Sequence, residues 1–207
     1  MKLPAEQTGG QKELTPEGNH VAVCYEVIDL GTQEVTHLDE VKQQRKVRIG
    51  WELSGELMED GRPFVISRRY TFSSHEKSTM RRHLEAWRGR KFKPEDFGEG
   101  GFDIRKLIGV GCMLQVVHNT KQDRTFANVE SVGSLPKGMP APELVNQPVY
   151  FSLETGEFDS TVLASLPDWM QEIIRKSPEF AALRKTRTVE DYVGEVEPAE
   201  YDDESPF

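Results

Sequence analysis

Apolar side chains recur at every second position in two separate stretches of this chain, and this period constrains the fold more than any other feature. The pattern runs through residues 21–27 (Val-Ala-Val-Cys-Tyr-Glu-Val) and again through residues 46–53 (Lys-Val-Arg-Ile-Gly-Trp-Glu-Leu). Successive side chains of a β-strand point to opposite faces of the sheet, so this period indicates a strand with one buried face. The sequence therefore predicts a mainly β protein.

A third strand is predicted from Phe64 to Phe72. It follows the turn signal Asp60-Gly61, which would join it to the second strand as a hairpin. Phe64, Ile66, Tyr70 and Phe72 would share one side of it with Arg68. Two more strands, Cys112–His118 and Thr125–Val132, are predicted to form a second hairpin around Asn119–Arg124.

A helix is predicted between the third and fourth strands, over about residues 74–88. Residues 73–76 (Ser-Ser-His-Glu) have the pattern of a capping box, Met80, Leu84 and Trp87 share one helical face, and Gly89 offers the stop. The order of three strands, a helix and two strands is that of a five-stranded OB barrel. We therefore expect a mainly β fold with an OB-like barrel.

The ends of the chain differ in composition from its middle. Residues 1–19 predict a flexible arm, residues 20–137 the OB-like domain, and residues 138–187 a proline-containing linker with a helical extension. The extension is a short helix at about Pro167–Lys185, which Pro178 should interrupt. Residues 188–207 hold eight acidic residues and no basic one, which predicts a disordered acidic tail.

Charge is divided unevenly along the chain, and the net charge of −9 conceals this. Residues 138–207 carry 5 basic and 15 acidic side chains, whereas residues 41–93 carry 14 basic and 6 acidic ones. A basic block of this kind can attract a phosphate backbone. The sequence thus combines a basic middle with an acidic end.

The second and third predicted strands combine cations with flat aromatic rings, the two features that binding of single-stranded nucleic acid requires. The face of these strands is also where OB folds bind their ligands. The alternative is that the rings belong to the core and the arginines are solvated. The candidate single-stranded DNA-binding residues are Lys42, Arg45, Lys46, Arg48, Trp51, Arg62, Phe64, Arg68, Arg69, Tyr70 and Phe72.

The last seven residues, Tyr-Asp-Asp-Glu-Ser-Pro-Phe, resemble the C-terminal tip of bacterial single-stranded DNA-binding proteins. That resemblance implies that the tip docks into basic-rimmed apolar pockets on replication, recombination and repair enzymes. Phe207 would fill the pocket while its carboxylate pairs with a cation. The predicted partner-binding residues are Asp202, Asp203, Glu204, Pro206 and Phe207.

The body of the chain does not follow the bacterial pattern. Residues 46–53, residues 67–71 with residues 75–77, and residues 135–138 are similar to a family of phage proteins encoded among replication and recombination functions. This resemblance implies a phage or prophage origin. We therefore expect a protein that binds and protects single-stranded DNA, is located in the cytoplasm of a phage-infected or lysogenic bacterial cell, and recruits enzymes through its tip.

Other functions stay open at this point. A strand-annealing recombination protein would have similar features, and a metal-dependent nuclease or an acidic DNA-mimic inhibitor is a further alternative. The chain contains no phosphate-binding loop, nucleophile elbow or zinc-protease motif, so no enzyme activity, catalytic residue, cofactor or metal site is predicted. No membrane segment is predicted, Cys24 and Cys112 are expected to be buried thiols, and the oligomeric state is left open.

Overall fold

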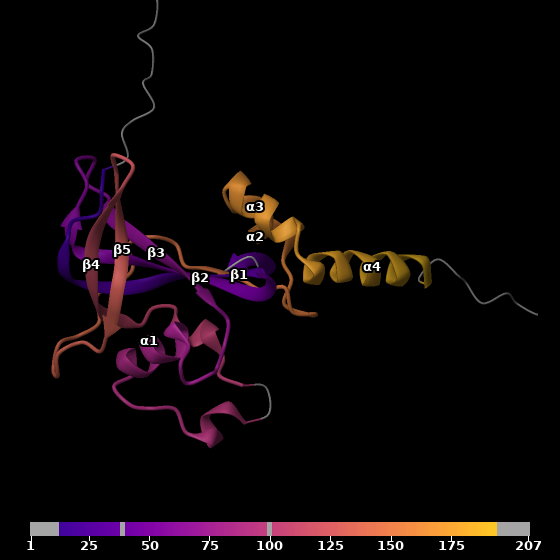
Figure 1. Cartoon of the computed structure of the whole chain (residues 1–207), viewed down its shortest axis with the longest axis horizontal. Coiled ribbons are helices and arrows are strands. Elements are labelled where there is room, and N and C mark those ends of the chain that lie inside the picture. Colours follow the sequence, from indigo (N-terminus) through magenta and orange to yellow (C-terminus); the bar gives the residue numbers. More distant parts are fainter. Residues whose placement is uncertain (1–12, 38–39, 99–100, 194–207) are drawn as a thin grey trace, which may run out of the picture.

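A mainly antiparallel β-sheet forms the body of the protein. The computed structural model describes residues 13–37, 40–98 and 101–193. The order of neighbouring strands is β3-β2-β1-β4-β5, and a short strand, β6, pairs in parallel with β1. Strands β1–β5 are labelled in Figure 1. The strands are β1 (Gly18–His37), β2 (Glu40–Leu57), β3 (Pro63–Thr71), β4 (Gly111–Lys121), β5 (Arg124–Gly133) and β6 (Val149–Phe151).

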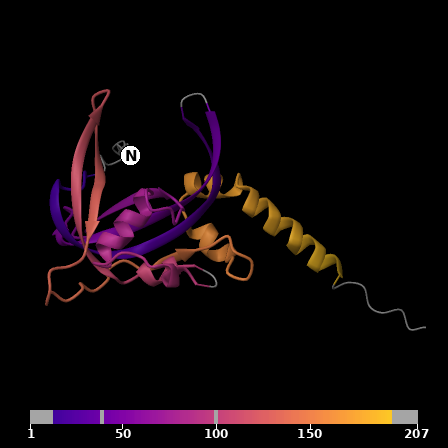
Figure 2. The ribbon, with the colours of Figure 1, turned by 60° about the horizontal axis from the view of Figure 1, so that its bottom comes forward.

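The alternating pattern places one side of each strand in the core, as predicted. Val47, Ile49, Trp51 and Leu53 of β2 all lie in the main hydrophobic cluster. Both predicted hairpins are present, because β2 pairs with β3 and β4 pairs with β5. The distal part of the β1–β2 hairpin and the tip of the β4–β5 hairpin project from the body toward the same side (Figure 2).

The sheet is not closed into a barrel by hydrogen bonds. Among the described residues, no backbone ladder joins β3 to β5. A side chain bridges these two strands instead, because the Arg68 guanidinium donates a hydrogen bond to the carbonyl oxygen of Val129. The structure therefore shows five strands and a helix in the predicted order, with the Arg68 side chain bridging the open seam between β3 and β5.

The helix between β3 and β4 begins later than predicted. α1 spans Thr79–Trp87, and its N-cap is Ser78, whose hydroxyl accepts a hydrogen bond from the Arg81 amide. The expected capping box at residues 73–76 is not used. A turn closed by the Ser78 amide and the His75 carbonyl carries the chain away from β3 first. Met80, Leu84 and Trp87 are buried, as predicted.

In the described part of the chain, three helices follow β6: α2 (Ser160–Ser165), α3 (Asp168–Arg175) and α4 (Pro178–Val193). The break at Pro178 is confirmed, since α3 ends before it and α4 begins at it. α4 extends to Val193, so the first six residues of the segment expected to be disordered are helical. Residues 194–207 lie outside the described residues. No helix in the described part of the chain is long and apolar enough to span a membrane.

Strand β1 contributes to two separate hydrophobic clusters. Its first half, including Ala22 and Val27, packs into the main core with β2–β5 and α1. Ile28 and Leu30 instead pack with Met170 and Ile174 of α3. The C-terminal helices are thereby attached to the sheet through the far half of β1, and α4 runs outward from this attachment (Figure 1). Both cysteines are buried and unpaired, as predicted.

Candidate nucleic-acid interface

Strand alternation divides the predicted binding residues between the two faces of the sheet. Trp51, Phe64 and Tyr70 point inward and are 0%, 8% and 3% exposed. Trp51 packs against Trp87 with ring centroids 5.9 Å apart. No base can stack on rings that are covered by the core, so the structure corrects their predicted role. These three aromatic residues are core residues, as the alternative interpretation held.

The outer face of β2 and β3 carries three of the predicted cations: Lys46, Arg48 and Arg69. Arg48 lies directly opposite Arg69 in the ladder, and Lys46 lies opposite Thr71. Like charges in opposite positions of a ladder repel one another. The charge of Arg48 and partial burial both contribute to the depressed pKa of Arg69, burial being the larger cause. This face is therefore electrostatically suited to an anion such as phosphate.

Trp169, from the first turn of α3, lies over these two arginines. The guanidinium carbons of Arg48 and Arg69 are 5.6 and 5.0 Å from the centroid of its ring. The Trp169 side chain is 45% exposed, although it is large and apolar. The chain has three tryptophans, and the other two, Trp51 and Trp87, are buried. We call Lys46, Arg48, Arg69 and Trp169 the cationic face.

Glu26 is the acidic neighbour of the cationic face. One oxygen of its carboxylate lies 3.1 Å from the Arg48 guanidinium. Burial raises the pKa of Glu26 above its ordinary value, although the charge of Arg48 opposes that shift. Arg69 forms no ion pair with an acidic side chain of the described residues. Of the two arginines, Arg69 therefore has the charge that is more available to a ligand.

The remaining predicted residues lie elsewhere. Arg45 and Phe72 line a cavity on the opposite side of the sheet, and Arg68 points into the seam between β3 and β5. Lys42 pairs with Glu40 near the end of the β1–β2 hairpin, and Arg62 pairs with Asp60 in the β2–β3 turn. The predicted partner-binding residues Asp202, Asp203, Glu204, Pro206 and Phe207 lie outside the described residues.

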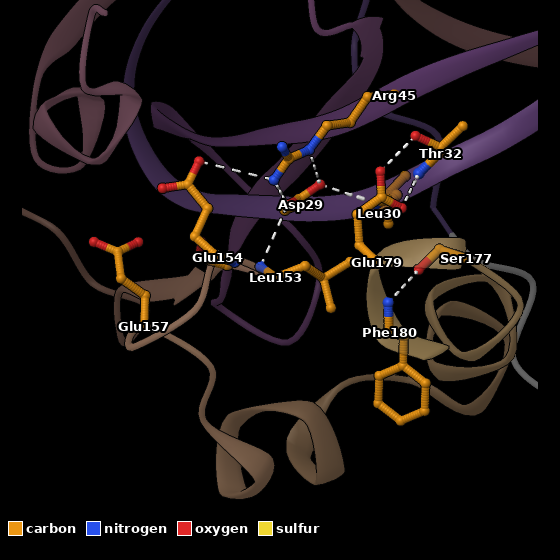
Figure 3. Close-up of polar contacts among 12 residues, drawn as sticks. Asp29, Leu30, Thr32, Arg45, Leu153, Glu154, Glu157, Ser177, Glu179 and Phe180 are labelled. Carbon is orange, nitrogen blue, oxygen red and sulfur yellow. Dashed lines mark hydrogen bonds and ion pairs between the residues drawn. The ribbon is translucent and has the colours of Figure 1, made fainter. Parts of the chain in front are cut away.

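A polar cluster fixes the C-terminal helices, and with them Trp169, to the sheet (Figure 3). The Asp29 carboxylate accepts hydrogen bonds from Arg45 at 2.5 and 3.3 Å, from the Gly31 amide at 2.9 Å and from the Leu153 amide at 3.3 Å. Next to it, the Glu179 carboxylate accepts from the amide and hydroxyl of Thr32 at 2.9 and 2.5 Å. These contacts join β1 to the segment after β6 and to the start of α4.

Gly31 allows this close approach. It has a φ of +70°, a conformation that L side chains rarely adopt, and a Cβ at this position would collide with the side chain of Ser177. The Ser177 hydroxyl accepts a hydrogen bond from the Phe180 amide at the start of α4 (Figure 3). The register of β1 with β2 shifts between Asp29 and Gly31, and the glycine permits contact between this point of β1 and the turn between α3 and α4.

Trp169 is not among the site residues predicted from the sequence, because the segment Pro167–Lys185 is predicted only as a short helical extension. The residues of α3 that are buried are Met170, Gln171 and Ile174. Trp169 is one position before this buried face, and each helical position is turned by about 100° from the next. This rotation turns Trp169 away from the buried face of α3, and it is the feature of the sequence that could have predicted an exposed ring.

Comparison with known proteins supplies no further assignment, since no family model matches the chain and no curated protein is significantly similar to it. Within the described residues, no group of three or more His, Cys, Asp or Glu side chains is arranged to hold a metal ion. What the interface can do chemically therefore follows from its own geometry. It offers three cations on one face of the sheet and, over two of them, the partly exposed indole ring of Trp169.

Proposed function

We propose that the protein binds single-stranded DNA on the cationic face. The observation that carries this proposal is the placement of Trp169 over Arg48 and Arg69. Unpaired bases stack on exposed aromatic rings for about 1–3 kcal/mol each, and cations along the same path neutralise the backbone phosphates. Duplex DNA keeps its bases stacked on one another, so it cannot use the indole in this way.

The strand order supports an OB-like interpretation of the fold. In β3-β2-β1-β4-β5, with α1 between β3 and β4, the two outer strands are those whose pairing would close a five-stranded barrel. The Arg68 side chain bridges these strands. OB folds bind oligonucleotides on the face of strands 2 and 3, between the loops after strands 1 and 4. The cationic face lies on those strands, and both hairpins project to one side (Figure 2).

The acidic C-terminal tip supplies the second half of the proposal. It would recruit replication, recombination and repair enzymes, with Phe207 as the anchor and Asp202, Asp203 and Glu204 steering the encounter. The support is the sequence of the tip and its resemblance to bacterial single-stranded DNA-binding proteins. A phage or prophage origin is part of the same proposal.

Fluorescence anisotropy with labelled oligo-dT and a duplex of equal length tests the DNA-binding half. We expect tighter binding of the single strand and an affinity that falls as salt rises, because bound cations release counterions from the phosphates. Equal affinity for the duplex would contradict the proposal.

Two variants locate the site. Trp169→Ala should lose about 1–3 kcal/mol of binding with little change in the salt dependence. Arg69→Gln should lower the slope of log affinity against log salt by about one unit. Arg62→Gln is the matched control, because Arg62 lies seven residues earlier, in an exposed ion pair with Asp60. If Arg62→Gln weakens binding as much as Arg69→Gln, the cationic face is not the site.

Tryptophan fluorescence gives a second, independent signal. Trp169 is the exposed tryptophan and the other two are in the core, so quenching by oligo-dT should come from Trp169. Trp169→Phe should abolish the quenching while retaining a ring on which a base can stack. Quenching that persists in this variant would mean that DNA acts on the core tryptophans from a distance.

Pull-down of bacterial replication and repair proteins tests the recruiting half, with the full chain and a chain that lacks only Phe207 as baits. Removing Phe207 takes away the anchoring ring and leaves the acids, so the capture of partner enzymes should collapse while DNA affinity barely moves. An unchanged set of captured enzymes would contradict recruitment through the tip.

A further inference from the structure

A second candidate binding site lies on the opposite side of the sheet from the cationic face. It is a half-open cavity of about 580 Å³ between β1, β2, α1, β6 and the segment that follows α1. Arg45 and Val47 of β2 line it, whereas Lys46 and Arg48 alternate to the other face. Aromatic rings form much of its wall, and these are Phe72, Phe92, Phe97, Phe102, Tyr150 and Phe151.

The charges in the wall of the cavity are already compensated. The Asp29 carboxylate forms an ion pair with the Arg45 guanidinium at 2.5 Å, and the Glu85 carboxylate forms one with the Arg81 guanidinium at 3.0 Å. The Arg81 guanidinium also donates to the carbonyl oxygen of Ser74. A ligand inside the cavity would therefore meet rings and paired charges.

The charges around the mouth are mainly negative. Asp103, Glu154 and Glu157 line it and are exposed, and the Glu154 side chain is 60% exposed. Within the described part of the chain, the ion pair of Glu154 is with Arg45, at 3.8 Å, and Arg45 is already paired with Asp29. Glu157 accepts a hydrogen bond from the Tyr150 hydroxyl. Glu154 and Glu157 lie beside the Asp29–Arg45 pair (Figure 3). A phosphate would be repelled here, whereas a cation would be attracted.

The rings of this region already hold guanidinium groups of the chain itself. Arg81 lies 5.3 Å from the centroid of the Phe97 ring, and Arg105 lies 4.9 Å from that of Tyr150. Aromatic faces attract the cationic groups of arginine and lysine through the ring quadrupole. We propose that the cavity binds an arginine or lysine side chain of a partner protein, together with an adjacent apolar residue. The aromatic wall would cover the apolar part, and the carboxylates at the mouth would face the cation.

This inference does not rest on the proposed DNA binding, and it can be tested with short peptides. The probes are acetyl-Phe-Arg-amide, acetyl-Phe-Gln-amide and acetyl-Phe-Glu-amide, added to the full chain carrying ¹³C-labelled methionine and isoleucine methyl groups. The methyls of Met80 and Ile104 line the cavity and should shift on binding. Met170 and Ile174 belong to the second hydrophobic cluster and are the internal controls.

We expect saturable shifts at Met80 and Ile104, strongest with the arginine peptide and weakest with the glutamate peptide. Glu154→Gln and Glu157→Gln should each lower the affinity for the arginine peptide by about threefold, the scale of an exposed ion pair. Arg105→Gln should raise that affinity, because it removes a cation near the mouth. Glu130→Gln, an exposed position on β5 outside the cavity, is the matched control.

Four results would overturn the proposal. The first is the absence of saturable shifts at millimolar peptide. The second is an equal response to the arginine and glutamate peptides, and the third is an affinity for the arginine peptide that neither Glu154→Gln nor Glu157→Gln changes. The fourth is oligo-dT that shifts Met80 and Ile104 and competes with the arginine peptide, since the cavity would then belong to the nucleic-acid site.

Discussion

The Asp29 carboxylate is expected to be the most sensitive polar group of the fold, and Asp29→Ala tests this. The side chain is 12% exposed and joins four donors from three segments. Alanine would leave the amides of Gly31 and Leu153 without that acceptor. It would also leave Arg45, whose side chain is 30% exposed, without its main partner. The perturbation is thus an unpaired charge together with two lost hydrogen bonds.

The expected cost follows from these contacts. Removing one member of a buried ion pair costs about 3–5 kcal/mol, and an unsatisfied buried amide costs about 1–3 kcal/mol. The two effects overlap, and Arg45 keeps some solvent and Glu154 at 3.8 Å. We therefore expect the free energy of unfolding to fall by about 3 kcal/mol, a large part of the stability of an ordinary domain.

Asp60→Ala is the matched control, because Asp60 also holds an arginine. The Arg62 guanidinium donates to Asp60 at 2.6 and 2.8 Å, but the two side chains are 48% and 73% exposed. Water replaces such a partner easily, so only a small fraction of the Asp29 effect is expected. Urea unfolding followed by far-UV circular dichroism measures both variants. If Asp60→Ala costs as much as Asp29→Ala, burial does not determine the strength of these pairs and the reasoning is refuted.

Three more perturbations test separate features. Burial, with the charges of Arg68 and Arg82, lowers the pKa of His83 from 6.5 to about 4. The unfolded chain therefore binds the proton more readily than the folded protein, so the free energy of unfolding should fall as pH drops from about 6.5 to 4. His83→Gln should remove this contribution to the pH dependence, which urea titrations across the range measure. Gly31→Ala should lower the melting temperature far more than Gly61→Ala, because both have positive φ but only the first would collide with a side chain. Trp51→Phe should lower the free energy of unfolding by about 1–3 kcal/mol and leave the affinity for oligo-dT unchanged, because Trp51 is buried in the core. A variant that stays stable but loses affinity would show that Trp51 belongs to the DNA-binding site.

The strands were predictable because their physical cause is local. In β2, the odd positions Val47, Ile49, Trp51 and Leu53 form a continuous apolar row, which only one face of a sheet can bury. Lys46 and Arg48 occupy even positions of the same strand and Trp51 an odd one, so they lie on opposite faces. Strict use of this alternation predicts that the ring lies in the core and that the two cations lie outside it.

Other features depend on contacts that sequence patterns do not report. The start of α1 differs from the prediction because Ser78, and not the box at residues 73–76, caps the helix, which places the buried Met80 in its first turn. Trp169 comes to the cationic face only because α3 docks on Ile28 and Leu30, more than 130 residues earlier in the chain. The aromatic cavity likewise combines β2, α1 and β6. Such long-range meetings have no local signature.

The sharing of β1 between two cores has a consequence for biosynthesis. Ile28 and Leu30 leave the ribosome early, but Met170 and Ile174, which cover them, are added more than 130 residues later. At about 5–20 residues per second, the nascent chain presents these apolar side chains uncovered for roughly 7–30 s. During that interval the far half of β1 is a surface on which chaperones or neighbouring nascent chains can act. A premature stop after β5 would make this exposure permanent, so truncated products should be degraded or should aggregate. Only chains that include the C-terminal helices would cover this part of β1.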